Sequence, residues 1–415
     1  LETRISRDSS DFAGDQEILV DAFFPTPALA ELRNFTITGD GAVTGGESGQ
    51  IRAISGSRVV YVDGDGVTTL FSNVTGDILV ASQRELDQQF QTLALKRPTD
   101  LVQADLDGDW GLVSLIVPDD LTTTSVNGRL ADVFFAGDSS LTTGIISMDG
   151  QGGFSGLFSG SISGSPDGDI TVNPGDGSIP FRTNTSKNVA VATLDEDDER
   201  EVVVLVRKPE TLSVADLAGQ WRVTITRVPK GLTEVFLNEE SGQSREADSA
   251  GTAQAGEVLA DLFFRQSFGQ DRATAGISST GVVTGTFPGQ LTVTPSREVS
   301  LAVDDSVVTL YPNADKTFMV GGAADEDVYE IIYCVKTSMD ANLTPEEAAD
   351  LRAIPVDDKL VLSWNGTSAL QLEEGASLSS WSSVEEGAGG DSFTVDPSQG
   401  GARFFRLVEK ALPQE

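Results

Sequence analysis

The sequence contains one pattern three times, and a long internal repeat of this kind decides the architecture before any single strand or helix is assigned. Each copy carries an aspartate between apolar residues, shortly before paired phenylalanines, and these aspartates are Asp21, Asp132 and Asp261. A Gly-x-apolar-hydroxyl-Gly segment follows each of them at the same distance, and the copies lie 111 and 129 residues apart throughout. The chain is therefore predicted to consist of three homologous units followed by a different C-terminal part.

The beginning of each unit is defined by an Asp-Leu-x-Gly-x-Trp segment, which ends in Trp110 in the second unit and in Trp221 in the third. The first unit lacks this segment. If it forms the first strand of each unit, the sheet of the first unit has open edges that can accept a strand from another chain. If it closes the preceding unit instead, the first unit is whole. We expect the units at residues 1–104, 105–215 and 216–343.

The third unit is longer than the others by 18 residues, which fall between Trp221 and Asp261. We interpret them as a surface loop or an extended hairpin. Within each unit, short segments that alternate (290–294) or are rich in valine (201–206) indicate β-strands separated by glycine-rich turns. About eight such strands at spacings of about 8 to 12 residues predict an antiparallel sandwich or an up-and-down barrel. The predicted fold class is all-β, with three homologous antiparallel units, each a small barrel or sandwich.

The C-terminal part differs from the repeats. Residues 344–353 predict a helical connector, because Thr344 can cap a helix, Pro345 suits its first turn and Glu347 can complete a capping box. Residues 354–415 contain further short apolar segments and predict a small C-terminal β module.

Two resemblances follow from these motifs. A Gly-x-Trp tripeptide that leads into a β-meander of this size resembles the calycin group of barrels, which implies that Trp110 and Trp221 each plug one end of a barrel. The segments Leu-Ser-Trp, Leu-Gln-Leu, Ser-Trp-Ser-Ser-Val and Ala-Arg-Phe-Phe-Arg-Leu resemble a terminal β module of secreted multi-repeat β-proteins from Verrucomicrobia and Planctomycetes type bacteria. This second resemblance implies export beyond the cytoplasm and implies no enzymatic activity.

The composition removes several classes of function. There are 64 acidic and 28 basic residues, a net charge of −36, which disfavours nucleic acids and anionic membranes as partners. The chain has no histidine, so it lacks the commonest general base and metal ligand. The single cysteine, Cys334, lies among apolar residues and is predicted to be a small buried residue rather than a nucleophile. No stretch is apolar enough to span a membrane as a helix.

Carboxylates are the remaining candidates for chemistry. Asp105, Asp107 and Asp109 copy the first positions of a calcium loop, but the rest of that loop is missing, so we interpret them as a structural turn and leave calcium as a minor alternative. The acidic runs 195–199 and 325–327 are predicted to be hairpin tips, and calcium bridging between subunits is a second minor alternative.

The repeated aspartates Asp21, Asp132 and Asp261 are predicted to be structural, because an active site seldom needs three copies. An enzyme is not expected: a glycosidase needs two carboxylates at a fixed separation across a cleft, and no pair can be nominated among so many. No cofactor is expected.

Five asparagines stand in Asn-x-Ser/Thr sequons and are candidate glycosylation sites in an extracellular chain. Two of them share a repeat position with Asn313, which has no sequon, so a turn role also explains them. The five are Asn34, Asn73, Asn184, Asn342 and Asn365.

These observations predict an extracellular structural protein at a bacterial cell surface, in which the units form a rod. We expect the subunits to assemble head-to-tail into a homopolymeric fibre or surface layer by β-strand complementation. The candidate subunit contacts are Leu1, Ile5, Phe404 and Phe405. The alternative is a secreted β-repeat protein that binds a glycan or a small ligand.

Overall fold

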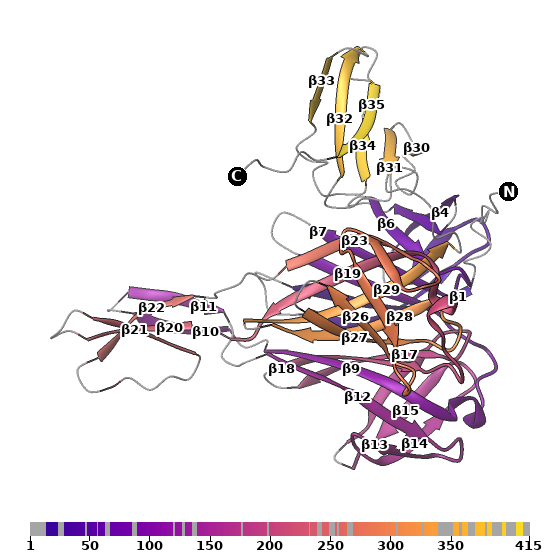
Figure 1. Cartoon of the computed structure of the whole chain (residues 1–415), viewed down its shortest axis with the longest axis horizontal. Helices are drawn as coiled ribbons and strands as arrows, with labels where there is room; N and C mark the ends of the chain where they lie inside the picture. The colour runs from indigo at the N-terminus through magenta and orange to yellow at the C-terminus, as the bar shows by residue number, and fades with distance from the viewer. Residues whose placement is uncertain are drawn as a thin grey trace.

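The computed structural model consists of three closed barrels, a projecting arm and a C-terminal module (Figure 1). It describes residues 14–409 except 24–28, 46–47, 56, 63–66, 85–88, 119–120, 127–128, 135–138, 176, 197–198, 232, 239–242, 249–253, 255–256, 264–268, 304–305, 326, 339–351, 357–358, 364–369, 378–379, 384–391 and 396–403. The predicted all-β class is confirmed. Each repeat unit builds a barrel and not a sandwich, because its first strand pairs with both its second and its last.

Barrel 1 contains eight antiparallel strands in sequence order. They are β1 (Gly14–Phe23), β2 (Leu29–Ile37), β3 (Ala42–Gly45), β4 (Gly49–Ser55), β5 (Arg58–Val62), β6 (Val67–Ser72), β7 (Ile78–Arg84) and β8 (Gln89–Lys96).

Barrel 2 begins with a 3₁₀ turn, η2 (Gln103–Leu106), which leads directly into its first strand. Its strands are β9 (Gly108–Pro118), β12 (Ser140–Met148), β13 (Gly153–Gly156), β14 (Gly160–Gly164), β15 (Asp169–Asn173), β16 (Ile179–Thr183), β17 (Val189–Glu196) and β18 (Glu199–Arg207).

Barrel 3 repeats this plan after the turn η3 (Val214–Leu217). Its strands are β19 (Gly219–Pro229), β23 (Gly269–Ile277), β24 (Val282–Gly285), β25 (Gly289–Val293), β26 (Val299–Val303), β27 (Ser306–Pro312), β28 (Phe318–Ala324) and β29 (Val328–Ser338).

The tryptophan segment opens barrels 2 and 3. Trp110 lies in β9 and Trp221 in β19; both are fully buried in the clusters that fill their barrels, and each indole Nε1 donates to a backbone oxygen of the preceding turn at 2.9 Å. In the described part of the first unit, β1 pairs with both β2 and β8, so barrel 1 is closed and the open sheet edges that we considered are not found there.

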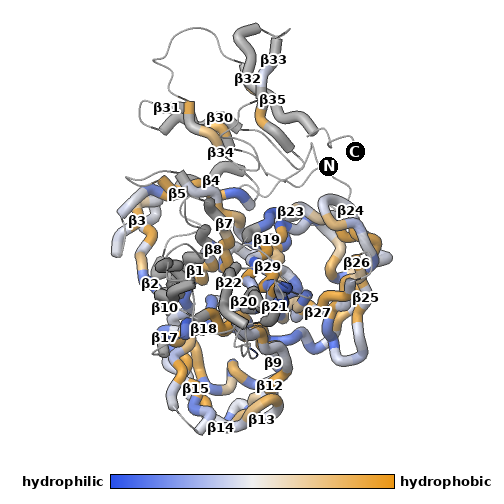
Figure 2. Tube along the Cα trace, turned by 90° about the vertical axis from the view of Figure 1, so that its left-hand side faces the viewer, coloured by the Kyte–Doolittle hydropathy of each residue, from blue (hydrophilic) through white to orange (hydrophobic). Residues whose placement is uncertain are grey.

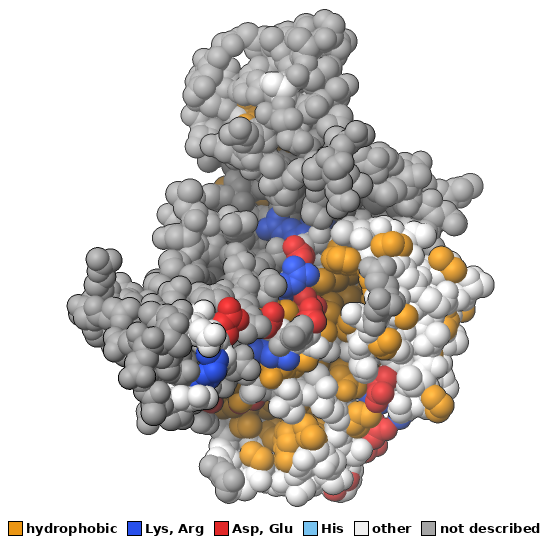
Figure 3. All heavy atoms as spheres, turned by 60° about the vertical axis from the view of Figure 1, so that its left-hand side comes forward, with side chains coloured by type: hydrophobic (Ala, Val, Ile, Leu, Met, Phe, Trp, Pro, Cys, Tyr) orange, Lys and Arg blue, Asp and Glu red, His pale blue; other side chains and the backbone are white. Residues whose placement is uncertain are grey.

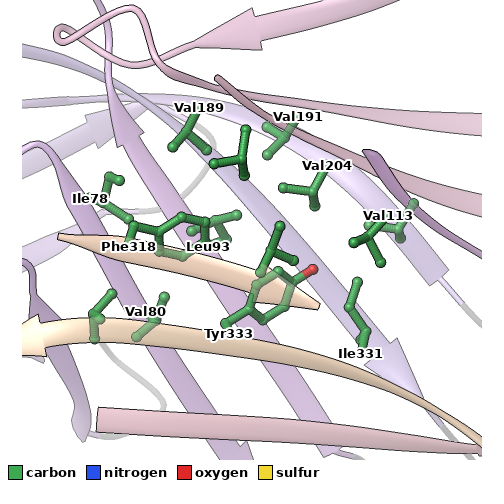
Figure 4. Close-up of a cluster of buried hydrophobic side chains, with 14 of the residues drawn as sticks. Ile78, Val80, Leu93, Val113, Val189, Val191, Val204, Phe318, Ile331 and Tyr333 are labelled. Carbon is green, nitrogen blue, oxygen red and sulfur yellow. The ribbon is translucent and has the colours of Figure 1, made fainter. Parts of the chain in front are cut away.

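The three barrels surround one shared core, so the expected rod is wrong (Figure 2). Strands of each barrel have a second apolar face on the outside, and these outer faces meet in a cluster of 20 buried residues. Four repeat positions supply one residue from each barrel to it, and most of these twelve residues are labelled in Figure 4. The four triplets are Ile78, Val189 and Phe318; Val80, Val191 and Val320; Leu93, Val204 and Tyr333; and Leu95, Val206 and Val335.

This arrangement is a closed pseudo-threefold assembly within one chain. Strands buried on both faces read as continuous apolar runs rather than alternating ones, as residues 202–206 do. The barrels approach closely where Gly111 of β9 meets Tyr311 of β27, since a side chain at Gly111 would overlap the tyrosine ring. Because the contact closes on itself, it cannot continue from one molecule to the next.

Two small sheets leave the barrels between their first and second strands and project together as an arm (Figure 1). From barrel 2 come β10 (Leu121–Val126) and β11 (Arg129–Phe134). From barrel 3 come β20 (Thr233–Asn238), β21 (Ser244–Asp248) and β22 (Glu257–Phe263), in the order β21-β20-β22. Strands β20 and β22 correspond to β10 and β11, so the additional residues of the third unit supply β21, which pairs with β20 and confirms the extended-hairpin interpretation.

The C-terminal module contains two three-stranded sheets, which are β30-β31-β34 and β33-β32-β35. The predicted connector helix falls largely outside the described residues. The strands are β30 (Arg352–Val356), β31 (Lys359–Ser363), β32 (Leu370–Ser377), β33 (Ser380–Ser383), β34 (Ser392–Val395) and β35 (Phe404–Glu409).

Candidate functional site

A ring of buried asparagines lies where the three barrels meet. Asn73, Asn184 and Asn313 are 0% exposed, and each carboxamide oxygen accepts hydrogen bonds from backbone N–H groups of the turn that follows it. Such bonds hold a tight turn in shape. The repeat position of these asparagines therefore has a structural role in all three units.

Each asparagine also donates its amide to the neighbouring barrel, always at the same repeat position. Asn73 donates to Thr317 Oγ1 of barrel 3 at 3.1 Å. Asn184 donates to Asp77 Oδ2 of barrel 1 at 2.7 Å, and Asn313 donates to Asn188 Oδ1 of barrel 2 at 3.2 Å. The three bonds run around the pseudo-threefold axis in one direction and join all three barrels.

This geometry separates the five sequons. Asn73 and Asn184 are buried in the ring with both amide atoms bonded, so a glycan on either is incompatible with the fold, and those two candidate sites are corrected to turn residues. Asn34 lies exposed on β2, where its oxygen accepts from Arg97 at 3.3 Å. Asn342 and Asn365 lie outside the described residues. Glycosylation at Asn34, Asn342 and Asn365 stays a prediction.

Ion pairs at equivalent positions reinforce two of the three barrel contacts. Arg97, after barrel 1, pairs with Asp169 of barrel 2 at 2.7 Å, and Lys208, after barrel 2, pairs with Glu298 of barrel 3 at 3.4 Å. Burial lowers the pKa of Lys208, although the charge of Glu298 partly opposes this. On the described face in Figure 3, basic side chains lie beside acidic ones. Basic side chains, which are few in this chain, therefore form ion pairs with carboxylates of the same molecule.

Of the three aspartates at the start of barrel 2, Asp105 and Asp109 bind other groups of this chain. Asp105 accepts from the Val102 N–H at the start of η2 and from Lys187 Nζ, both at 2.9 Å. Although burial alone raises the pKa of Asp105, these hydrogen bonds and the charge of Lys187 bring it below its ordinary value. Asp109 binds Arg297 of barrel 3 at 2.6 Å, and Asp107 ends η2. We find no cluster of three or more metal-ligating side chains in the described part of the chain.

The other predicted residues are placed as follows. Asp21, Asp132 and Asp261 lie on β1, β11 and β22. The acidic run 195–199 joins β17 to β18 and the run 325–327 joins β28 to β29, which confirms both as hairpin tips.

The predicted subunit contacts are only partly described. Leu1 and Ile5 lie outside the described residues. Phe404 begins β35, and Phe405 packs against Phe393 in the core of the C-terminal module, with ring centroids 6.3 Å apart. Subunit contact through these residues stays a prediction.

Cys334 is buried, and burial raises the pKa of its thiol to about 12. It therefore stays protonated at neutral pH and is a packing residue, as the sequence predicts.

Unpaired strand edges are found in the arm. Of the described strands, β10 and β11 pair only with each other, and β21 and β22 each pair only with β20. The sequence of β10 is LTTTSV, which carries none of the charged residues or prolines that protect exposed edges, whereas β21 is SREAD. In the described chain, the arm and the C-terminal module both offer main-chain groups to another strand, because the outer strands of the two sheets of the module, β30, β34, β33 and β35, also pair with one strand each.

The sequence did not reveal the shared core or the asparagine ring as contacts between barrels. A usable signal was present: apolar runs without alternation recur at the same repeat positions, which marks strands covered on both faces.

Comparisons with known proteins add little. No family model and no curated protein matches the chain. Among solved structures, it is similar to transferrin binding protein B from Neisseria meningitidis serogroup B, with 8% identity, a TM-score of 0.22, and coverage of 78% of this chain and 77% of that one. A Trp-176-Ala mutant of transferrin binding protein B from Haemophilus parasuis Hp5 gives 7% identity, a TM-score of 0.22, and coverage of 78% and 76%.

The described residues contain no helix with the length and apolar character needed to cross a membrane.

Proposed function

We propose that the chain is an extracellular structural protein whose copies assemble with one another through main-chain strand edges. The three barrels form a rigid body in this proposal, and the arm provides the attachment. The observation that carries it is the contrast between barrels that are filled and closed and an arm whose edges are open.

The barrel interiors favour a structural role over a ligand-binding one. In barrel 2, fifteen buried residues including Trp110 form one cluster, and a cluster around Trp221 fills barrel 3. Barrels that hold a ligand keep an open interior. We therefore place the proposed activity on the outside of the molecule.

The position of the open edges favours self-association. The apolar outer faces of the barrel strands that meet at the axis are already used in the pseudo-threefold core, so these faces are not available to a second molecule. A strand added to β10, whose sequence lacks protecting charges, or to β21 would gain backbone hydrogen bonds without disturbing a barrel. The extracellular location rests on the resemblance of the C-terminal module to those of secreted bacterial proteins.

The net charge sets the conditions for assembly. Each copy carries a charge of −36, so copies repel one another at low ionic strength. Charges are screened over about 10 Å at 0.1 M salt. We expect association to increase when salt is raised from about 0.01 M to physiological strength, where the screening length falls from about 30 Å to about 8 Å.

Sedimentation velocity over a range of protein concentrations tests the proposal. The wild-type chain should form species that grow with concentration. The variant T122K/T124K places lysines on β10 and should reduce association at least tenfold if the arm supplies the contact, because charged residues block strand addition at an edge. A matched control is S161K/S163K, which adds the same charge at exposed positions of β14 in barrel 2 and should associate like wild type.

A wild-type chain that sediments as a single molecule at every concentration and salt would overturn the proposal. Association that the arm variant leaves unchanged would overturn the assignment of the contact to this edge.

A further inference from the structure

A fibre or layer needs a contact that continues from one copy to the next. A contact between the same surface of two copies is satisfied by one pair of molecules and stops at a dimer. Two different surfaces that join head-to-tail can continue without limit. If the arm supplies one side of this contact, a different part of the chain must supply the other.

Unpaired strand edges occur at two separate places in the described chain. The arm projects from one side of the barrels, and the C-terminal module stands on another side (Figure 1). In the arm, β10, β11, β21 and β22 each pair with a single strand. In the module, the strands with a single partner are β30, β34, β33 and β35. The molecule therefore carries the two different sets of edges that a head-to-tail contact requires.

Charge distinguishes these edge strands from one another. Of the eight described edge strands in the arm and the module, five contain at least one charged residue. The uncharged ones are β10 (LTTTSV) in the arm and β33 (SWSS) and β34 (SFTV) in the module. Charged residues at an edge oppose strand addition, and chains of net charge −36 repel where their carboxylates meet. The uncharged edges are therefore where two copies can form a main-chain ladder.

The two uncharged module strands differ in their surroundings. β34 lies beside β6 of barrel 1, so the barrels stand close to its sheet. β33 belongs to the other sheet of the module, which lies farther from the barrels (Figure 1). Ser382 of β33 is exposed. A second copy can therefore approach β33 more freely than β34.

We propose that β10 in the arm of one copy adds to β33 in the C-terminal module of another, an inference that rests on the proposed function and names both surfaces of its contact. β10 approaches β22 of the neighbouring arm sheet but shares no hydrogen-bonded ladder with it. The new ladder brings the threonines of β10 opposite the serines of β33, and cross-strand hydroxyl pairs favour strand pairing. Each copy then binds one neighbour through its arm and a second through its module.

The short length of the ladder makes each link weak. β33 has 4 residues, and small isolated strand pairings are only marginally stable in water. Assembly through this contact should therefore depend steeply on protein concentration. A change of two residues within such a short strand should be enough to remove the link.

Complementation between two defective variants tests the contact. T122K/T124K blocks β10 and keeps the module, whereas S380K/S382K blocks β33 and keeps the arm. Each variant alone should associate at least tenfold less than wild type in sedimentation velocity. An equimolar mixture should form a dimer with one copy of each variant, because the intact β10 of one meets the intact β33 of the other. This dimer should not grow, since both of its remaining edges are blocked.

The matched control is S161K/S163K, which adds the same charge at exposed positions of β14 in barrel 2. It should polymerise like wild type, and added T122K/T124K chains should shorten its polymers, because they accept an arm but offer none. Far-UV circular dichroism checks that both defective variants keep the wild-type strand content. If S380K/S382K loses it, Ser382→Lys alone is the milder variant and should weaken association at least threefold.

Three results would overturn the inference, and they are separable from the fate of the proposed function. A module variant that associates like wild type, while the arm variant does not, would show a contact of arm with arm and leave the structural role intact. A mixture of folded variants that forms no dimer would also overturn the pairing of β10 with β33. A wild-type chain that stays single at every concentration would overturn both this contact and the proposed function.

Discussion

Replacing Asn184 by alanine is the sharpest test of the ring that joins the barrels. The Asn184 oxygen accepts from the N–H groups of Asn188 and Val189, both at 2.9 Å, and its amide donates to Asp77 at 2.7 Å and to the Asn188 side chain at 3.0 Å. Alanine removes all four bonds in a site that is 0% exposed.

The expected loss follows from the groups left behind. Asp77 keeps hydrogen bonds from Asn73 and from the Ser186 N–H, so the loss of its bond from Asn184 destabilises the fold only a little. The two backbone N–H groups of the turn, in contrast, lose their acceptor. A buried polar group without a partner costs about 1–3 kcal/mol. Asn184→Ala should therefore lower the free energy of unfolding by about 3 kcal/mol.

Asn184→Asp separates the two functions of the side chain. Aspartate retains an acceptor for the turn but places a second carboxylate against Asp77, and like charges at this distance repel. We expect the aspartate variant to be least stable at neutral pH and to recover as the pH falls and one carboxylate is protonated. The alanine variant should show no such recovery.

The assay is urea denaturation followed by tryptophan fluorescence, to which two of the four tryptophans, Trp110 and Trp221, contribute from the interiors of barrels 2 and 3. Asn34→Ala is the matched control, because Asn34 is an exposed sequon residue outside the ring and its loss should cost less than about 0.5 kcal/mol. An Asn184→Ala variant within that margin of wild type, with an unchanged denaturant slope, would refute the role of the ring.

Three further outcomes follow from the structure. Burial lowers the pKa of Lys336 to about 8 from an ordinary 10.5, so the folded chain binds this proton more weakly than the unfolded chain does. The free energy of unfolding should therefore rise by up to about 3 kcal/mol between pH 8 and 10.5. Lys336→Met should lack this rise when unfolding is measured as a function of pH. Trp110→Ala should cost about 3–5 kcal/mol in denaturant unfolding, because it empties the end of barrel 2, and a loss under 1 kcal/mol would contradict the plug. The pKa of Asp216 lies below its ordinary 3.8, chiefly through its hydrogen bonds with Ser213, so stability should fall as acid protonates it, and Asp216→Asn should flatten this part of the profile.

The three antiparallel β units could be predicted from the sequence because their information is local, whereas the choice between barrel and sandwich depends on which strands pair at the two ends of the sheet and stayed open. The repeat indicated the unit, the alternation and turns indicated the strands, and the Gly-x-Trp segment indicated two core tryptophans, Trp110 and Trp221, which the structure buries. The buried state of Cys334 followed from its apolar neighbours in the same way.

The relation between the barrels could not be predicted so directly. A valine on the outer face of β17 or β18 has the same local pattern whether it meets solvent, another barrel or another molecule. The place of β1 was also hidden, because strand pairing depends on which edge is free and not on the alternation of the strand itself. Asn73 and Asn184 show the same limit: their sequons are real sequence matches, but burial at the axis decides their role.

Electron cryomicroscopy of the full chain at increasing concentration is the measurement that tests self-assembly most directly. The account predicts filaments or layers whose repeating subunit contains three barrels around one axis, with contacts between subunits made by arm strands. Discrete single molecules at every concentration would contradict the structural role, and filaments in which the barrels form a linear string would contradict the closed pseudo-threefold arrangement.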